Sequence, residues 1–180
     1  IYLEILCQKY PNQMNNDSNF TNENGYRKIK TMVALSKGGC HQLSTNELFD
    51  LGHRIHLIDG IDLGMRERTG TYVIQEEDIT LVETCSSSSV PHILNGLNSL
   101  QIEPEQVKYI IHVHLDHAGG AGLLMEKCPN AKLVVHPRGA RHMIDPTRLI
   151  QGAKAVYGPQ FDSLFNPILP IPEERVIIKD

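Results

Sequence analysis

The stretch YIIHVHLDHAGG, residues 109–120, joins an apolar run to three histidines, an aspartate and a pair of glycines. The apolar run predicts a buried strand, and the histidine cluster lies at its C-terminal end. Alternate residues of an extended segment point the same way, so His112 and His114 can offer two imidazoles to one ion. The chain then turns, which lets Asp116 and His117 face a second point nearby. Neutral imidazoles and a carboxylate suit zinc, and also iron or manganese.

The alternative interpretation is a histidine-rich surface loop, because a single HxH pair often arises by chance. Four ligand-type residues in this order, between an apolar strand and a glycine-rich helix start, are much harder to explain as an accident. The small residues of the run AGGAG, residues 118–122, let the backbone approach closely and leave room above bound ions. The stretch therefore predicts a metal site, and two ions about 3.5–4 Å apart can bridge a hydroxide there.

Strand and helix patterns alternate outside the cluster. Apolar runs predict strands in RIHLID, TYVIQ, ITLVET, KLVVH and RVIIK, which begin at residues 54, 71, 79, 132 and 175. Helical spacing and capping residues predict helices that begin near Ser89, Gly119 and Asp145, the last with an apolar stripe from Leu149 to Tyr157. A further helix over 45–51 is one interpretation of an ambiguous stretch. The alternation predicts a layered α/β domain.

The polar N-terminal region differs from the rest of the chain. Residues 11–30 hold six asparagines and few side chains able to bury area, so residues 1–50 are predicted to form an Asn-rich arm or loop. Residues 51–180 are predicted to form the folded domain. A length of 180 residues with 41% hydrophobic and 21% charged residues is ordinary for one globular domain.

Charge and cysteine content narrow the class of partners. A net charge of −4 gives no basic footprint for nucleic acid. No apolar run approaches the roughly 18 residues needed to cross a bilayer, so no membrane partner is expected. The four cysteines are far apart and form no CxxC pair, which is neither a zinc-ribbon pattern nor a disulfide framework. Reduced thiols and a cytoplasmic location are the expectation.

The sequence HVHLDHAGG resembles the HxHxDH signature of the metallo-β-lactamase superfamily. The preceding ITLVETCSSSS resembles that family's early strand and acidic turn, and KLVVHPRGARHMIDPTRL is similar to a subgroup of hydrolases with the same fold. The resemblance covers residues 54–180. It implies an αββα sandwich with the metal site at one edge, between two sheets, and residues 51–180 would be its N-terminal portion.

The resemblance also implies the chemistry of a metal-dependent hydrolase with two divalent ions, zinc first, with iron or manganese as alternatives. His112 and His114 would bind the first ion, and Asp116 and His117 the second. A metal-bound hydroxide would attack an ester, thioester, lactone or related bond of a small-molecule substrate. Asp116 would orient that water and so be the catalytic residue. A homo-oligomer is left open.

Several departures from the family pattern qualify this expectation. The family adds a third histidine, a bridging aspartate and a last histidine well after the cluster, whereas His142 is the last histidine here and follows too closely. We therefore expect a fold incomplete at the C-terminus, and a chain that is inactive or needs a partner chain. The alternatives are a non-catalytic member that acts by binding, and an oxygen- or nitric oxide-reducing diiron protein. That last subgroup usually carries Glu where His114 stands, which argues against it.

The acidic turn shows two further departures. Glu83 stands where the family commonly has Asp, and it could still hydrogen-bond a ligand histidine. Cys85 occupies a place where glycine is frequent, so a positive φ there would be strained. A buried, inert thiol is the favoured interpretation of Cys85, with a third ligand or a reactive thiol as alternatives. Ile111 directly precedes His112, and a small deletion in this strand could shift that histidine.

Overall fold

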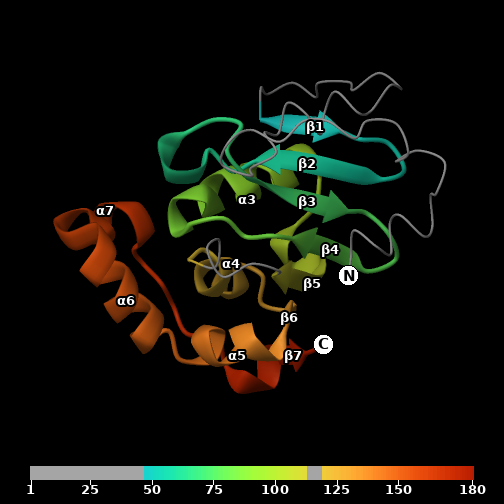
Figure 1. The fold of residues 1–180 in the computed structure, drawn as a ribbon. Helices are drawn as coiled ribbons and strands as arrows, with labels where there is room; N and C mark the ends of the chain where they lie inside the picture. Colours follow the sequence, from blue (N-terminus) through green and yellow to red (C-terminus); the bar gives the residue numbers. More distant parts are fainter. Residues whose placement is uncertain (1–46, 113–118) are drawn as a thin grey trace, which may run out of the picture.

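The computed structural model describes residues 47–112 and 119–180, which are built around one seven-stranded sheet in the order β1 to β7 (Figure 1). The first four strands are antiparallel: β1 Leu48–Asp50, β2 Ile55–Asp59, β3 Gly70–Ile74 and β4 Ile79–Val82. Three strands then follow parallel to β4: β5 Val107–His112, β6 Lys132–Val135 and β7 Val176–Ile178. The carboxyl ends of β4 to β7 therefore lie at one edge of the sheet.

In the described residues, five α-helices connect or follow the strands. They are α3 Val90–Ser99, α4 Ala121–Lys127, α5 Pro137–Ile144, α6 Thr147–Tyr157 and α7 Phe161–Phe165. Short 3₁₀ turns are η1 Asp62–Gly64, η2 Ser87–Ser89, η3 Pro104–Gln106, η5 Gly158–Gln160 and η6 Glu173–Arg175. In Figure 1, α6 and α7 extend away from the sheet on the left. None of the helices in the described part of the chain is long and apolar enough to cross a membrane.

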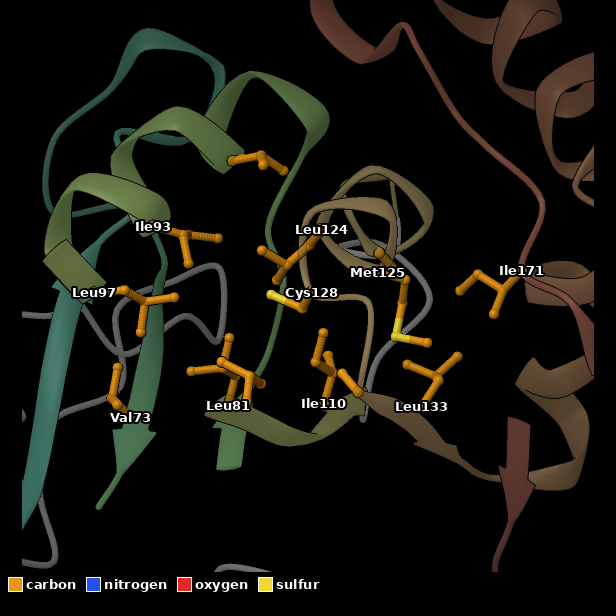
Figure 2. Close-up of a cluster of buried hydrophobic side chains, with 14 of the residues drawn as sticks. Val73, Leu81, Ile93, Leu97, Ile110, Leu124, Met125, Cys128, Leu133 and Ile171 are labelled. Carbon is orange, nitrogen blue, oxygen red and sulfur yellow. The ribbon is translucent and has the colours of Figure 1, made fainter. Parts of the chain in front are cut away.

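The core lies between the sheet and the helices α3 and α4 (Figure 2). One row of buried residues crosses four strands in register, from Val73 through Leu81 and Ile110 to Leu133. Against this row pack Ile93 and Leu97 of α3, and Leu124, Met125 and Cys128 at α4. Each large aliphatic side chain buried here stabilises the fold by about 1.5–3 kcal/mol. The core therefore fixes β4 and β5 against each other, and both strands lead to the histidine cluster.

The predicted α/β class and the strands of the sheet are confirmed. The helix predicted over 45–51 is wrong where the structure describes it, because Phe49 pairs with Leu57 in an antiparallel ladder. Strand β1 thus belongs to the sheet, although residues 1–50 were assigned to the arm. The rest of that arm, residues 1–46, lies outside the described residues, and its role stays a prediction.

Two helices near the C-terminus differ from expectation. The sequence analysis did not predict α5, whose Ala140 and Met143 are buried. Helix α6 was predicted with an apolar stripe, but none of its residues is buried and Val156 is 78% exposed. Leu149 of this stripe packs, partly buried, against the core, and the ring of Tyr157 lies 4.8 Å from that of Phe165 in the short helix α7.

Arg175, at the start of β7, holds the C-terminal end of α4. Its Nη1 donates to Met125 O (3.0 Å), its Nη2 to Cys128 O (2.7 Å) and its Nε to Ala131 O (3.1 Å). The last carbonyls of a helix have no partner within the helix, and a cation is favoured beside them. A guanidinium can satisfy three diverging carbonyls because its donors spread from one plane.

Replacing Arg175 by lysine should lower the free energy of unfolding by about 1–2 kcal/mol, because a single ammonium cannot reach all three carbonyls. Urea unfolding followed by circular dichroism would measure the difference. Arg138, an exposed residue of α5, provides the matched control, and Arg138→Lys should leave the midpoint unchanged. Equal midpoints for all three chains would mean that the Arg175 contacts contribute nothing to stability.

Candidate metal site

The structure places one of the four predicted metal ligands. His112 is the last residue of β5, at the carboxyl edge of the parallel strands. His114, Asp116 and His117 lie in residues 113–118, outside the described residues, so their roles stay a prediction. Within 47–112 and 119–180, no three or more His, Cys, Asp or Glu side chains gather into a group that could hold a metal ion.

The environment of His112 is unusual for a histidine that only fills the core. The residue is 3% exposed, and neither ring nitrogen has a hydrogen-bond partner among the residues that the structure describes. A buried polar group left without a partner costs about 1–3 kcal/mol, so such groups are rare in folded proteins. A metal ion is the kind of partner that would remove this cost for an imidazole.

Glu83 lies beside the ring of His112. Its Oε2 is 3.4 Å from Nδ1, and both residues stand at the carboxyl ends of neighbouring strands, β4 and β5. Histidine ligands commonly turn one ring nitrogen towards a carboxylate and the other towards the ion. In this arrangement Nδ1 faces Glu83 and Nε2 is left to face an ion, so His112 is arranged as a single ligand of a divalent metal would be.

The turn after β4 has a strained backbone. Glu83 has φ 69° and Cys85 has φ 54°, so Cys85 adopts the positive φ that would be strained at this position. Non-glycine residues in this region cost of order 1–3 kcal/mol each and persist where the surroundings hold them. Glu83 is held by its own amide, which donates to Ile111 O at 2.9 Å. The strain therefore lies directly beside His112.

The same turn also holds the glycines that follow the histidine cluster. The Gly120 amide donates to Cys85 O (3.0 Å), and the Ser87 hydroxyl is 2.8 Å from Gly119 O. A Cβ on Gly120 would lie 2.7 Å from Thr84 O and 2.8 Å from Ser86 O. Close backbone approach thus explains the glycine at residue 120. Both ends of the segment 113–118 are held by the turn after β4.

The thiol of Cys85 is inert. The residue is fully buried, and burial, with a smaller contribution from the nearby Asp62 carboxylate, raises the pKa of the thiol to about 12. Burial also raises the pKa of Cys128 to about 12. Because the thiolate is the form that binds metals and attacks electrophiles, neither thiol is suited to these roles. The interpretation of Cys85 as a buried thiol is confirmed.

Sequence reasoning missed two buried aspartates, Asp59 at the end of β2 and Asp62 in the loop that follows it. Asp59 is 1% exposed and accepts the amides of Ile61 and Glu67. Asp62 is 4% exposed and accepts the amide of Ser86 at 3.0 Å. An aspartate in a loop usually satisfies its own turn, so the sequence gives no indication that Asp62 reaches the turn after β4.

The parallel strands, the helices packed on them and the histidine at the shared edge define a mixed α/β fold of the metallo-hydrolase type. The description "metallo-beta-lactamase superfamily" belongs to the family model that matches residues 66–178, more than half of the sequence. The chain belongs to the metallo-β-lactamase superfamily.

Individual relatives are more distant. A rubredoxin-oxygen oxidoreductase of Megalodesulfovibrio gigas is 29% identical over 101 residues, which cover 49% of this chain and 25% of that protein. Among solved structures, native FEZ-1 metallo-beta-lactamase from Legionella gormanii matches with 17% identity and a TM-score of 0.52, covering 77% of this chain and 49% of that one. MEM-A1, a subclass B3 metallo-beta-lactamase from a soil metagenome library, matches with 20% identity and a TM-score of 0.53, covering 77% and 47%.

These likenesses confirm the fold. The chain spans about half the length of the solved structures and a quarter of the curated relative. At this level of identity they leave the reaction and the ion to experiment.

Proposed function

We propose that this chain carries the metal-binding edge of a metal-dependent hydrolase that acts on an ester, thioester, lactone or related bond of a small molecule. The observation that supports the proposal is His112, a buried imidazole at the carboxyl edge whose Nδ1 lies beside Glu83 and whose Nε2 has no partner among the described residues. Membership of a superfamily whose members are mostly hydrolases adds to it.

Each residue has a distinct part in this proposal. When bound, a divalent ion would polarise the carbonyl oxygen of the substrate and lower the pKa of a water molecule. His112 would bind through Nε2, with Nδ1 turned to Glu83 so that the ring keeps one tautomer. His114 would complete the first position, and Asp116 and His117 the second. Asp116 would also orient the attacking water and accept its proton.

A second candidate is an oxygen-reducing oxidoreductase with two iron ions. The match to a rubredoxin-oxygen oxidoreductase favours it, because it is a curated relative with 29% identity over the matched residues. His114 argues against it, since that subgroup usually carries Glu at this position. Iron rather than zinc, together with consumption of dioxygen, would distinguish this candidate from the hydrolase.

The deciding experiment is metal analysis of the purified 180-residue chain, followed by hydrolysis assays with a generic lactone, thioester and ester. We expect zinc to bind, and a chelator to remove both the zinc and any hydrolysis. A chain that stays free of metal after zinc, iron and manganese are each added would refute the proposal. Zinc binding without hydrolysis would favour the non-catalytic member that acts by binding.

A further inference from the structure

The loop between β2 and β3 carries a buried carboxylate that reaches the turn beside the histidine cluster. We propose that Asp62 is a positioning residue for the metal site: its carboxylate fixes the turn of residues 84–87, which in turn fixes the glycines that end the histidine motif. This inference rests on the proposed function, because it assigns a role in holding the metal ligands.

The contacts of Asp62 connect its own loop, between β2 and β3, to the turn after β4. Its Oδ1 accepts the amide of Ser86 at 3.0 Å and lies 3.4 Å from the Ser89 hydroxyl. Its Oδ2 lies 3.5 Å from Nε of Arg68, which is itself partly exposed. A carboxylate that accepts a backbone amide forms a strong, charge-assisted hydrogen bond, and at 4% exposure water does not compete for it. The position of Ser86 is thereby fixed.

The loops also fit closely against each other. A Cβ on Gly60 would lie 2.7 Å from the sulfur of Cys85, so the backbone of the first loop lies directly on the side chain of the second. Movement of the turn towards this loop is blocked by contact, and movement away from it would break the bond between Asp62 and Ser86. The turn therefore has one position relative to the sheet.

Beyond Ser86, the turn contacts the end of the histidine motif. The carbonyl oxygens of Thr84, Cys85 and Ser86 surround Gly120, and that of Cys85 accepts the Gly120 amide. The Ser87 hydroxyl donates to Gly119 O. A displaced turn would release Gly119 and Gly120, and with them the C-terminal end of the ligand segment. Ligands spaced for an ion bind it tightly only when their positions are fixed before binding.

The backbone around Asp62 is strained, as expected for a residue held in a particular direction. Ile61 has φ 43° and Leu63 has φ 52°, values that branched or bulky side chains rarely adopt. Such conformations persist where surrounding contacts determine them and gather at functional sites. This strain therefore supports a role for Asp62 in addition to closing its own turn.

Asp59 provides a matched control. It is the last residue of β2, directly before the same loop, it is as deeply buried, and its carboxylate also accepts backbone amides. Those amides belong to Ile61 and Glu67, so these hydrogen bonds stay inside the loop and do not reach the turn of residues 84–87. A general loss of loop stability would affect both variants, whereas loss of positioning would affect Asp62 alone.

The experiment compares Asp62→Ala and Asp59→Ala with the unchanged chain by zinc titration against a chromogenic chelator, and by amide exchange of Gly120 in the metal-free protein. We expect Asp62→Ala to weaken zinc binding about 10- to 100-fold. We also expect it to speed exchange at Gly120 about tenfold, because the turn that accepts this amide is released. Asp59→Ala should lower the unfolding midpoint and leave both readouts unchanged.

Equal zinc affinity and equal Gly120 exchange in both variants would overturn the inference and leave the proposed function intact. If the unchanged chain binds no zinc, the proposed function fails. In that case, unaltered Gly120 exchange in Asp62→Ala would also overturn the inferred coupling between Asp62 and Gly120. Should Asp62→Ala not fold, Asp62→Glu keeps the charge and moves the oxygens by one methylene. It should weaken zinc binding and speed Gly120 exchange in the same direction, and wild-type values in both would overturn the inference.

Discussion

Replacing His112 by leucine should abolish zinc binding and leave the metal-free chain as stable as before, or about 1 kcal/mol more stable. The imidazole is buried and makes no hydrogen bond to the described residues: Nδ1 has the 3.4 Å contact with Glu83, and Nε2 has no partner among them, so an unsatisfied Nε2 costs the metal-free fold stability. Leucine has a similar volume and needs no partner. Zinc titration and urea unfolding in the presence of a chelator would measure the two effects separately.

His56 is the control for this experiment, because it is a second buried histidine of the same sheet. Its Nε2 lies 2.8 Å from Oε1 of Gln75, so one of its two ring nitrogens is hydrogen-bonded, whereas neither nitrogen of His112 has a hydrogen bond among the described residues. His56→Leu should lower stability and leave zinc binding unchanged, the reverse of His112→Leu. If His112→Leu loses stability and keeps zinc, the residue is a structural histidine and the assignment of the metal site is wrong.

The two adjacent glycines of the motif should respond very differently to alanine. At Gly120 a Cβ would meet the carbonyls of Thr84 and Ser86 at 2.7 and 2.8 Å, whereas at Gly119 the nearest atom is 3.7 Å away. Backbone carbonyls cannot rotate aside as a flexible side chain can. Gly120→Ala should therefore cost about 1–3 kcal/mol of stability and weaken zinc binding, because the turn and the start of α4 must separate.

Gly119→Ala tests whether the loss expected for Gly120→Ala comes from the lack of room for a Cβ and not from the loss of a glycine as such. We expect it to leave the unfolding midpoint and the zinc affinity close to those of the unchanged chain. Differential scanning fluorimetry with and without zinc would report both quantities. Similar losses in the two variants would contradict the close approach of the turn to Gly120.

The strand that carries the histidine cluster could be predicted from its apolar run, whose residues are buried or partly buried in the structure. Part of what surrounds the end of this strand could also be predicted: parallel strands share a carboxyl edge, and Glu83 directly follows the strand beside β5. Helix α5 could not be predicted, because PRGARHMI holds few apolar residues and its burial depends on contact with β7. The helix is stabilised by its place in the fold more than by its own sequence.

The role of Asp62 lay beyond sequence reasoning for a different reason. Its partner Ser86 is 24 residues away, and no periodicity links a loop carboxylate to a distant backbone amide. The strain at Ile61 and Leu63 was equally hidden, because neither residue type favours positive φ. Only the folded arrangement of the two loops brings these residues together.

The turn after β4 sets a limit on how this motif can vary in length. The Glu83 amide donates to Ile111 O, and the Cys85 carbonyl accepts the Gly120 amide. The two ends of the intervening segment are therefore a fixed distance apart. An inserted or deleted residue between them cannot be absorbed by sliding either end, and must change the spacing of the ligands themselves. The exposed turn of residues 76–78 is also closed, by the pairing of Ile74 with Thr80, but it carries no predicted ligand, so an insertion there would lengthen only the hairpin loop.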